Sequence, residues 1–334
     1  MNVMTRSAAP VTTEPRPARR RIDLRDFGIV GGLVAIVVYL SLATTTFLTG
    51  QNLANLLDQV AVVGLLAIGA TLCIVSGAFD LSCTANLACS AIVGVFATQA
   101  LGTVGGFVVA LATGTALGTL TGVAIVLTRV NSFIGSLAIS IIYRGLAVVI
   151  TGGMIVSLPP DARAAAQTWA SPMVGGLTGS TILFVAFAVV FGLVLWGTTF
   201  GRRIYAVGGN AEAARLSGIR TPAVRVAAFA VSGLCAGAAG MVLVARAGSA
   251  QPALATGIEL TAIAAVVIGG TSILGGAGAM WRTVVGVAVL TVIGNGFNLL
   301  RWDTTYQQVV TGSLILLAVA ADSWLSRGSR RGRG

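Results

Sequence analysis

The sequence contains no histidine and no lysine, so all 21 of its basic residues are arginine. Without histidine, the chain has no histidine-based nucleophile, proton shuttle or metal site. Without lysine, it cannot contain the P-loop motif GxxxxGK[ST] and cannot bind ATP in that way. No pair of carboxylates has an obvious hydrolytic partner, and no GxSxG motif stands out. A membrane enzyme would need a cluster of such groups, and none is visible.

Cysteine is also scarce. Cys73, Cys83, Cys89 and Cys235 all lie in apolar stretches, and no two of them form a CxxC pair. This spacing argues against a zinc site. We therefore expect four small buried residues and no metal site.

Charged residues make up only 9% of the chain and hydrophobic residues 56%, whereas about 25% of a soluble domain is charged. The mean hydropathy is +0.93. These values exclude an ordinary soluble protein. Long apolar runs recur from end to end, so the sequence predicts an all-α polytopic membrane protein with transmembrane helices.

A membrane span needs about 20 apolar residues, and ten candidates meet this length. They cover residues 27–48, 57–76, 82–100, 104–128, 132–150, 181–200, 226–246, 258–274, 284–300 and 306–324. An even number of spans places both termini on the same side of the membrane.

The placement of arginine fixes the predicted orientation. With the N-terminus inside, 17 of the 21 arginines fall on the inner side and 3 on the outer side, and Arg144 falls within a span. This asymmetry follows the positive-inside rule and predicts that both termini are cytoplasmic. Residues 1–26 and 325–334 are expected to be basic cytoplasmic tails whose charge faces the membrane surface and binds no nucleic acid. We expect the first apolar run to be a retained span, because no cleavage site of a signal peptide stands out.

Two of the apolar segments are interrupted. The first interruption is SGAFDLS at residues 76–82, and the second is GIELT at residues 257–261, followed by GGTSILGGAG at 269–278. One lies in the first five spans and the other in the second five. An odd number of spans in each repeat would invert one half relative to the other. Inverted repeats with glycine-interrupted segments are typical of transporters.

Ionisable groups within spans are candidates for function because lipid-facing charge is expensive. Asp80, Glu259 and Arg144 meet this criterion, and we expect them to line a translocation pathway. Alternatively, the two carboxylates cap the helices that follow them. Arg144 could instead extend its side chain to the outer interface.

Uncharged polar residues mark further candidates for the pathway. Asn86, Asn131, Asn295 and Asn298 lie in or beside spans, and Phe133 neighbours one of them. Amides bind a hydroxylated solute without the desolvation cost of a charge, and an aromatic face suits a sugar ring. Alternatively, these amides hold helices together.

The longest inner loop carries the sequence GRRIYAVGGNAEAARLSGI over residues 201–219. Asn210 is a plausible N-cap, residues 212–216 form a short helical stretch, and Gly218 is well placed to end it. A short charged helix between two spans is expected to bind a protein partner or the membrane surface.

This loop closely resembles the cytoplasmic loop of ribose/xylose-type ABC sugar-importer permeases. Glu212, Ala213 and Ala214, with Gly218 after three more residues, resemble the first half of the motif by which such permeases dock on their ATPase. The glycine-rich segment 269–278, the segment NGFNLL at 295–300 and the stretch from 306 to 322 also resemble the family. The resemblance covers residues 27–324.

The chain departs from the family in two places. The family usually has GGIDLSVG where residues 77–84 read GAFDLSCT, and FIxTL where residues 133–137 read FIGSL. Both departures lie along the expected pathway, and they leave the substrate more open than the fold.

The resemblance implies a permease subunit in the plasma (inner) membrane of a bacterium, with two inverted five-helix halves over residues 27–324 and a coupling loop at 201–225. It implies three partners, namely an ATPase that holds ATP and Mg²⁺, an extracytoplasmic sugar-binding protein and a second permease copy. No cofactor and no catalytic residue is expected on this chain itself. The residues expected to couple to the ATPase are Gly201, Arg202, Arg203, Asn210, Glu212, Ala213, Ala214, Arg215 and Gly218.

Other functions remain open from the sequence. Related permeases carry nucleosides, branched-chain amino acids or signalling sugars. An ion-coupled secondary transporter with the same repeat is a further alternative, but a proton-coupled carrier needs titratable groups in mid-membrane. Only Asp80 and Glu259 are available, and both lie near interruptions.

Overall fold

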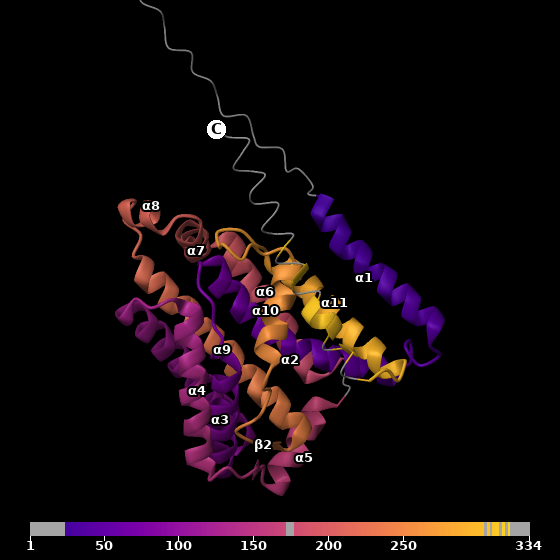
Figure 1. Cartoon of the computed structure of the whole chain (residues 1–334). Helices are drawn as coiled ribbons and strands as arrows, with labels where there is room; N and C mark the ends of the chain where they lie inside the picture. Colours follow the sequence, from indigo (N-terminus) through magenta and orange to yellow (C-terminus); the bar gives the residue numbers. More distant parts are fainter. Residues whose placement is uncertain are drawn as a thin grey trace, which may run out of the picture.

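The computed structural model describes residues 24–171 and 177–303, together with 306–307, 309–313, 316–317 and 320. This part of the chain is built almost entirely of helices (Figure 1), which confirms the predicted all-α class. The expected tails lie outside the described residues, except that residues 24–26 already belong to the first helix. The described residues of the last expected span are helical.

Eight helices occupy the predicted spans within the described residues up to 303. They are α1 (Leu24–Ala43), α2 (Gly50–Val75), α3 (Cys83–Thr128), α4 (Ser132–Thr151), α6 (Gly179–Gly197), α9 (Thr221–Ala247), α10 (Ile258–Ile268) and α11 (Met280–Leu299). Six of them are long and apolar enough to cross a membrane, whereas α10 and the apolar part of α1 are shorter. The chain is therefore a multi-pass membrane protein.

Helix α3 contains two of the predicted spans. It has 46 residues, about twice the 20 that one span needs, and its two parts pack side by side, because Asn86 donates to the carbonyl of Gly114 at 2.9 Å. Gly102 interrupts it with a φ of 69° and a ψ of 179°. This conformation suits glycine, and it separates the predicted spans 82–100 and 104–128.

Short elements lie at opposite ends of the helices (Figure 1). At the lower end in that view lie α5 (Pro160–Ala170) and the antiparallel pair of β1 (Val156–Ser157) and β2 (Ser249–Ala250). At the upper end lie α7 (Thr199–Gly209) and α8 (Ala211–Leu216). We call these the α5 end and the α8 end.

The core forms where α2, α3 and α9 pack together. A Cβ atom at Gly114 of α3 would overlap the carbonyl oxygen of Gly233 in α9. Small residues let two helix backbones approach this closely, and such contacts hold membrane helices together. The four cysteines are buried and unpaired, as predicted.

The first predicted interruption is present, because the chain is not helical between the end of α2 at Val75 and the start of α3 at Cys83. The second lies earlier than predicted, because residues 248–257 separate α9 from α10, whereas residues 258–261 form the first turn of α10. The predicted span 258–274 is wrong in length, because α10 ends at Ile268 and a glycine-rich segment follows it to residue 279.

Candidate functional site

The first turns of α3 and α10 meet through a hydrogen bond. The hydroxyl of Thr84 donates to Oε2 of Glu259 at 2.8 Å. The same oxygen accepts the backbone N–H of Gly257 at 2.9 Å. Glu259 therefore satisfies a backbone donor at the start of its own helix and also binds the helix from the other half of the chain.

The depth of this contact follows from the lengths of the connecting segments. Gly77 and Gly275 are adjacent at the α8 end, where a Cβ atom on Gly275 would lie 3.0 Å from the Cα of Gly77. The 11 residues of α10 span about 16 Å. The contact between Thr84 and Glu259 therefore lies about 16 Å from the α8 end, near the middle of a 30 Å bilayer core.

Arg144 joins this contact from α4. Its guanidinium donates to the hydroxyl of Thr84 at 3.3 Å and to the carbonyl of Leu254 at 2.9 Å, and it also binds the carbonyl of Pro252. The side chain is half-buried and turns inward. Arg144 thereby attaches the segment before α10 to α3 and α4.

Asp80 occupies a separate, fully buried network. Its carboxylate accepts the hydroxyl of Ser82 at 2.6 Å, the backbone N–H of Ser82 at 2.9 Å and the hydroxyl of Ser232 at 2.7 Å. Ser232 belongs to α9, so Asp80 joins the first interruption to the core helix behind it. The N-cap of α3 is Ser82, which makes no side-chain capping bond.

The first turn of α4 holds the first interruption in place. Ser132 accepts the backbone N–H of Phe79 at 3.0 Å, and Ser136 accepts that of Leu81 at 3.0 Å. Asn131 caps α4 by accepting the N–H of Phe133 at 2.9 Å. The rings of Phe133 and Phe79 lie edge to face, 6.3 Å apart.

The remaining amides lie apart from this centre. Asn86 donates to the carbonyl of Gly114 and accepts from Ser90, both within α3. Asn295 of α11 exchanges two hydrogen bonds with Asn52 of α2, at 2.8 and 3.1 Å. Asn298 is exposed.

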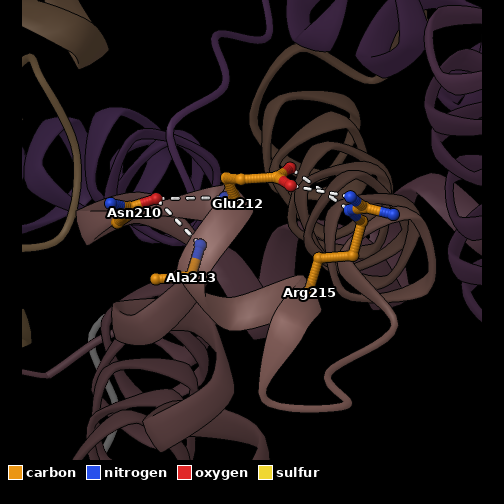
Figure 2. A network of polar contacts seen from close by, with 4 residues as sticks. All are labelled: Asn210, Glu212, Ala213 and Arg215. Carbon is orange, nitrogen blue, oxygen red and sulfur yellow. Dashed lines mark hydrogen bonds and ion pairs between the residues drawn. The ribbon is translucent and has the colours of Figure 1, made fainter.

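At the α8 end, a short helix forms as the sequence predicts. The side chain of Asn210 accepts the N–H groups of Glu212 and Ala213 at 3.1 and 3.0 Å (Figure 2). The helix ends at Leu216, and Gly218 follows with a φ of 83°. Asn210 is therefore the N-cap, and the short helix at 212–216 is confirmed.

The outer face of α8 carries an ion pair and an apolar residue. Arg215 donates to Glu212 at 2.6 Å (Figure 2), and the hydrogen bond and the charge of Arg215 lower the pKa of the Glu212 carboxyl. Leu216 beside them is 77% exposed. Ala214 faces inward and is buried.

Helix α7 differs from the prediction, in which residues 201–209 belong to a loop. Its side chains Ile204 and Val207 are fully buried, and the hydroxyl of Tyr205 donates to the carbonyl of Gly278 at 2.8 Å. Burial raises the pKa of the Tyr205 hydroxyl, and the positive charge of Arg282 lowers this pKa by a smaller amount. Gly201, Arg202 and Arg203 therefore lie on a helix that starts at Thr199.

Helix α7 touches both interrupted regions at one point. A Cβ atom on Gly208 would overlap the carbonyl oxygen of Val75 and would lie 2.6 Å from the backbone nitrogen of Gly276. Gly276 itself donates to the carbonyl of Val75 at 2.9 Å. We call the contact between Gly77, Gly208, Gly275 and Gly276 the glycine junction.

The structure thus brings together some of the predicted residues and separates others. Arg144 and Glu259 share Thr84 at mid-depth, and Asn131 and Phe133 lie on the helix that holds the first interruption. Asp80, Asn86 and Asn295 each belong to a different network. Thr84 and Gly208 are not predictable as functional residues, because no sequence pattern distinguishes them from the many other threonines and glycines of the chain.

Interrupted helices that meet inside the helix bundle, with a separate short helix exposed at one end, are typical of membrane transport proteins. Within the described residues, no three histidine, cysteine or acidic side chains lie close enough to hold a metal.

Comparison with known proteins gives the family. Residues 52–319 match the family described as branched-chain amino acid transport system / permease component. This match covers most of the chain, so the chain belongs to that family. A permease component is a transport subunit and is not itself an enzyme.

Its curated relatives include three sugar permeases. The ribose import permease protein RbsC of Escherichia coli (strain K12) is 38% identical over 301 residues, which cover 87% of this chain and 92% of that protein. The ribose import permease protein of Bacillus subtilis (strain 168) is 38% identical and covers 87% and 90%. The xylose transport system permease protein of Escherichia coli (strain K12) is 32% identical and covers 93% and 94%.

Proposed function

We propose that this chain is the membrane-spanning subunit of an ATP-driven importer that carries a monosaccharide such as ribose or xylose. The observation that carries the proposal is the similarity to ribose and xylose permeases over 87% or more of the chain. The family description names branched-chain amino acids, so these are the alternative solute.

The α8 end is the proposed docking surface for the ATPase. Helix α8 is stabilised by its Asn210 cap and is anchored by Ala214, while Glu212, Arg215 and Leu216 remain exposed. An exposed ion pair beside an exposed leucine suits a protein surface of mixed polarity. The ATPase would hold ATP and Mg²⁺, so this chain needs no cofactor of its own.

The glycine junction offers a path for the coupling between the ATPase and the solute. Movement of α8 and α7 would reach Val75 and Gly276 directly, since Gly208 leaves no room between them. Val75 ends the helix before the first interruption, and Gly276 lies in the glycine-rich segment after α10. The helices α3 and α10 next to them meet at Thr84 and Glu259. A close-packed contact of this kind moves in discrete steps, as a two-state element does.

The solute would pass close to the mid-depth centre. Arg144, Glu259 and Thr84 offer both hydrogen-bond donors and acceptors there, which suits the hydroxyls of a sugar. Asp80, Asn86 and Asn295 are proposed to shape the pathway from within the helix packing, and Asn298 is proposed to line it from an exposed position. Asn131 and Phe133 lie at its α8 end.

The proposal includes an orientation and an assembly. The α8 end and both termini face the cytoplasm of a bacterial cell, as the arginine asymmetry favours. An extracytoplasmic binding protein delivers the solute at the α5 end. A second copy of this chain, or a related permease, completes the channel.

The test is co-purification of the tagged chain from native membranes in a mild detergent. We expect a soluble ATPase to co-purify with the chain and to be lost from the variant Glu212→Arg. Asp161→Arg reverses an exposed charge at the α5 end and should leave capture of the ATPase unchanged. A chain that purifies alone, with uptake that collapses with the ion gradient, would overturn the proposal in favour of a secondary transporter.

A further inference from the structure

A polar cavity at the α8 end carries the inference. Its volume is about 410 Å³, and it lies between the end of α3, the start of α4 and the start of α9. None of its lining residues belongs to α7 or α8. A different cavity, lined by Arg203 and residues 217–220, lies beside those helices.

Two arginines line the 410 Å³ cavity, and neither has a carboxylate partner in the part of the chain that the structure describes. Arg129 is the C-cap of α3, and Arg225 lies in the first turns of α9. The Nε atom of Arg225 is buried and has no hydrogen-bond acceptor. Burying a donor without an acceptor costs more free energy than a typical hydrogen bond contributes. The Nε atom of Arg225 therefore requires an acceptor that the chain does not supply.

The backbone adds to the positive potential. Helix α4 starts at Ser132 and α9 starts at Thr221, and both residues line the cavity. Each helix N-terminus carries a partial positive charge, and that of α9 has no side-chain cap. Two arginines and two helix N-termini around one cavity form a site for an anion.

The surroundings indicate which anion. Val130, which lines the cavity, and Ile134 in the first turn of α4 are 47% and 67% exposed, so apolar surface suited to acyl chains lies near the charged cavity. Basic pockets between membrane helices on the cytoplasmic side suit the phosphates of anionic lipids. Arginine also matches the geometry of phosphate oxygens with paired donors.

We propose that Arg129 and Arg225 bind a phosphate group in this cavity, and that the group belongs to an anionic phospholipid of the cytoplasmic leaflet. This inference rests on the orientation proposed above. The cavity is also lined by Gly77 and Ser132, and Ser132 holds the backbone of Phe79. A bound phosphate would therefore stabilise the first interruption together with the start of α4.

The experiment is native mass spectrometry of the full-length chain in detergent, titrated with phosphatidylglycerol, with phosphatidylcholine and with inorganic phosphate. We expect wild type to retain phosphatidylglycerol in preference to phosphatidylcholine. Arg129→Gln and Arg225→Gln should each weaken that binding about fivefold, whereas Arg225→Lys should keep most of it. Arg301→Gln removes an exposed charge at the opposite end and serves as the matched control.

Each outcome decides the proposal. If inorganic phosphate saturates the cavity and displaces the lipid, the cavity is a phosphate site whose ligand is the free anion. This outcome would overturn the lipid part of the proposal. If Arg301→Gln loses as much phosphatidylglycerol binding as the cavity variants, the proposed site is overturned. The binding would then reflect general attraction between the positive chain and the anionic lipid. Unchanged lipid binding in Arg225→Gln, together with loss of the ATPase, would also overturn it and assign the cavity to a carboxylate of the ATPase. Loss of lipid binding with the ATPase retained leaves the importer proposal intact, so the two proposals fail separately.

Discussion

Thr84 donates a hydrogen bond to Glu259 at 2.8 Å, and the two residues come from opposite halves of the chain. Each stands in the first turn of a helix that follows an interruption. Arg144 approaches the same threonine at 3.3 Å. The contact therefore links the two halves of the chain near the middle of the bilayer core, which a solute has to pass to cross the membrane.

We expect Thr84→Val to lower transport about tenfold while leaving membrane insertion intact. Valine keeps the shape of threonine but removes the donor to Glu259 and the acceptor of Arg144, and a difference of about 1.4 kcal/mol between two states corresponds to a factor of ten. Uptake by the assembled transporter is the measurement.

Thr84→Ser is the matched control, because serine retains the hydroxyl. It should transport close to the wild-type rate. Equal rates for wild type, valine and serine would show that the contact is dispensable for transport.

Gly208→Ala should disturb coupling at the glycine junction. The added methyl group would overlap the carbonyl oxygen of Val75, and such overpacking costs about 1–3 kcal/mol. Transport per ATP hydrolysed should fall, whereas the ATPase should still co-purify because α8 itself is unchanged.

Gly209→Ala tests the same substitution one residue later. A Cβ atom there meets nothing within 4 Å, so this variant should behave as wild type. If both alanine variants transport equally well, the junction carries no coupling.

Asp80→Ala should destabilise the protein. It removes the acceptor of the Ser232 and Ser82 hydroxyls and of one backbone N–H group in a buried site. We expect a loss of about 2 kcal/mol in the free energy of unfolding, measured as thermal stability in detergent. A variant that keeps its stability but loses uptake would instead place Asp80 in contact with the solute.

Asn52 and Asn295 should show energetic coupling. Each single change to leucine leaves one buried amide without its partner, whereas the double variant removes both. A double-mutant cycle of unfolding free energies should give a coupling of about 0.6–1.7 kcal/mol. A coupling near zero would mean that other groups satisfy the amides.

The sequence by itself determined the fold class and most of the spans. Apolar runs of about 20 residues have few other stable conformations, because every backbone polar group in a bilayer core needs an internal partner. The N-cap at Asn210 and the helix after it were also predictable, since capping is local chemistry between residues two or three positions apart.

The tertiary structure alone decided which residues meet. Thr84 and Glu259 are 175 positions apart, and β1 pairs with β2 although Val156 and Ala250 are 94 positions apart. Periodicity predicts that a segment is helical but not which of its faces meets a distant partner. The same reason explains why Gly208 could not be singled out among 44 glycines, and why α7, whose buried side chains and tyrosine find their partners in remote segments, was interpreted as a loop.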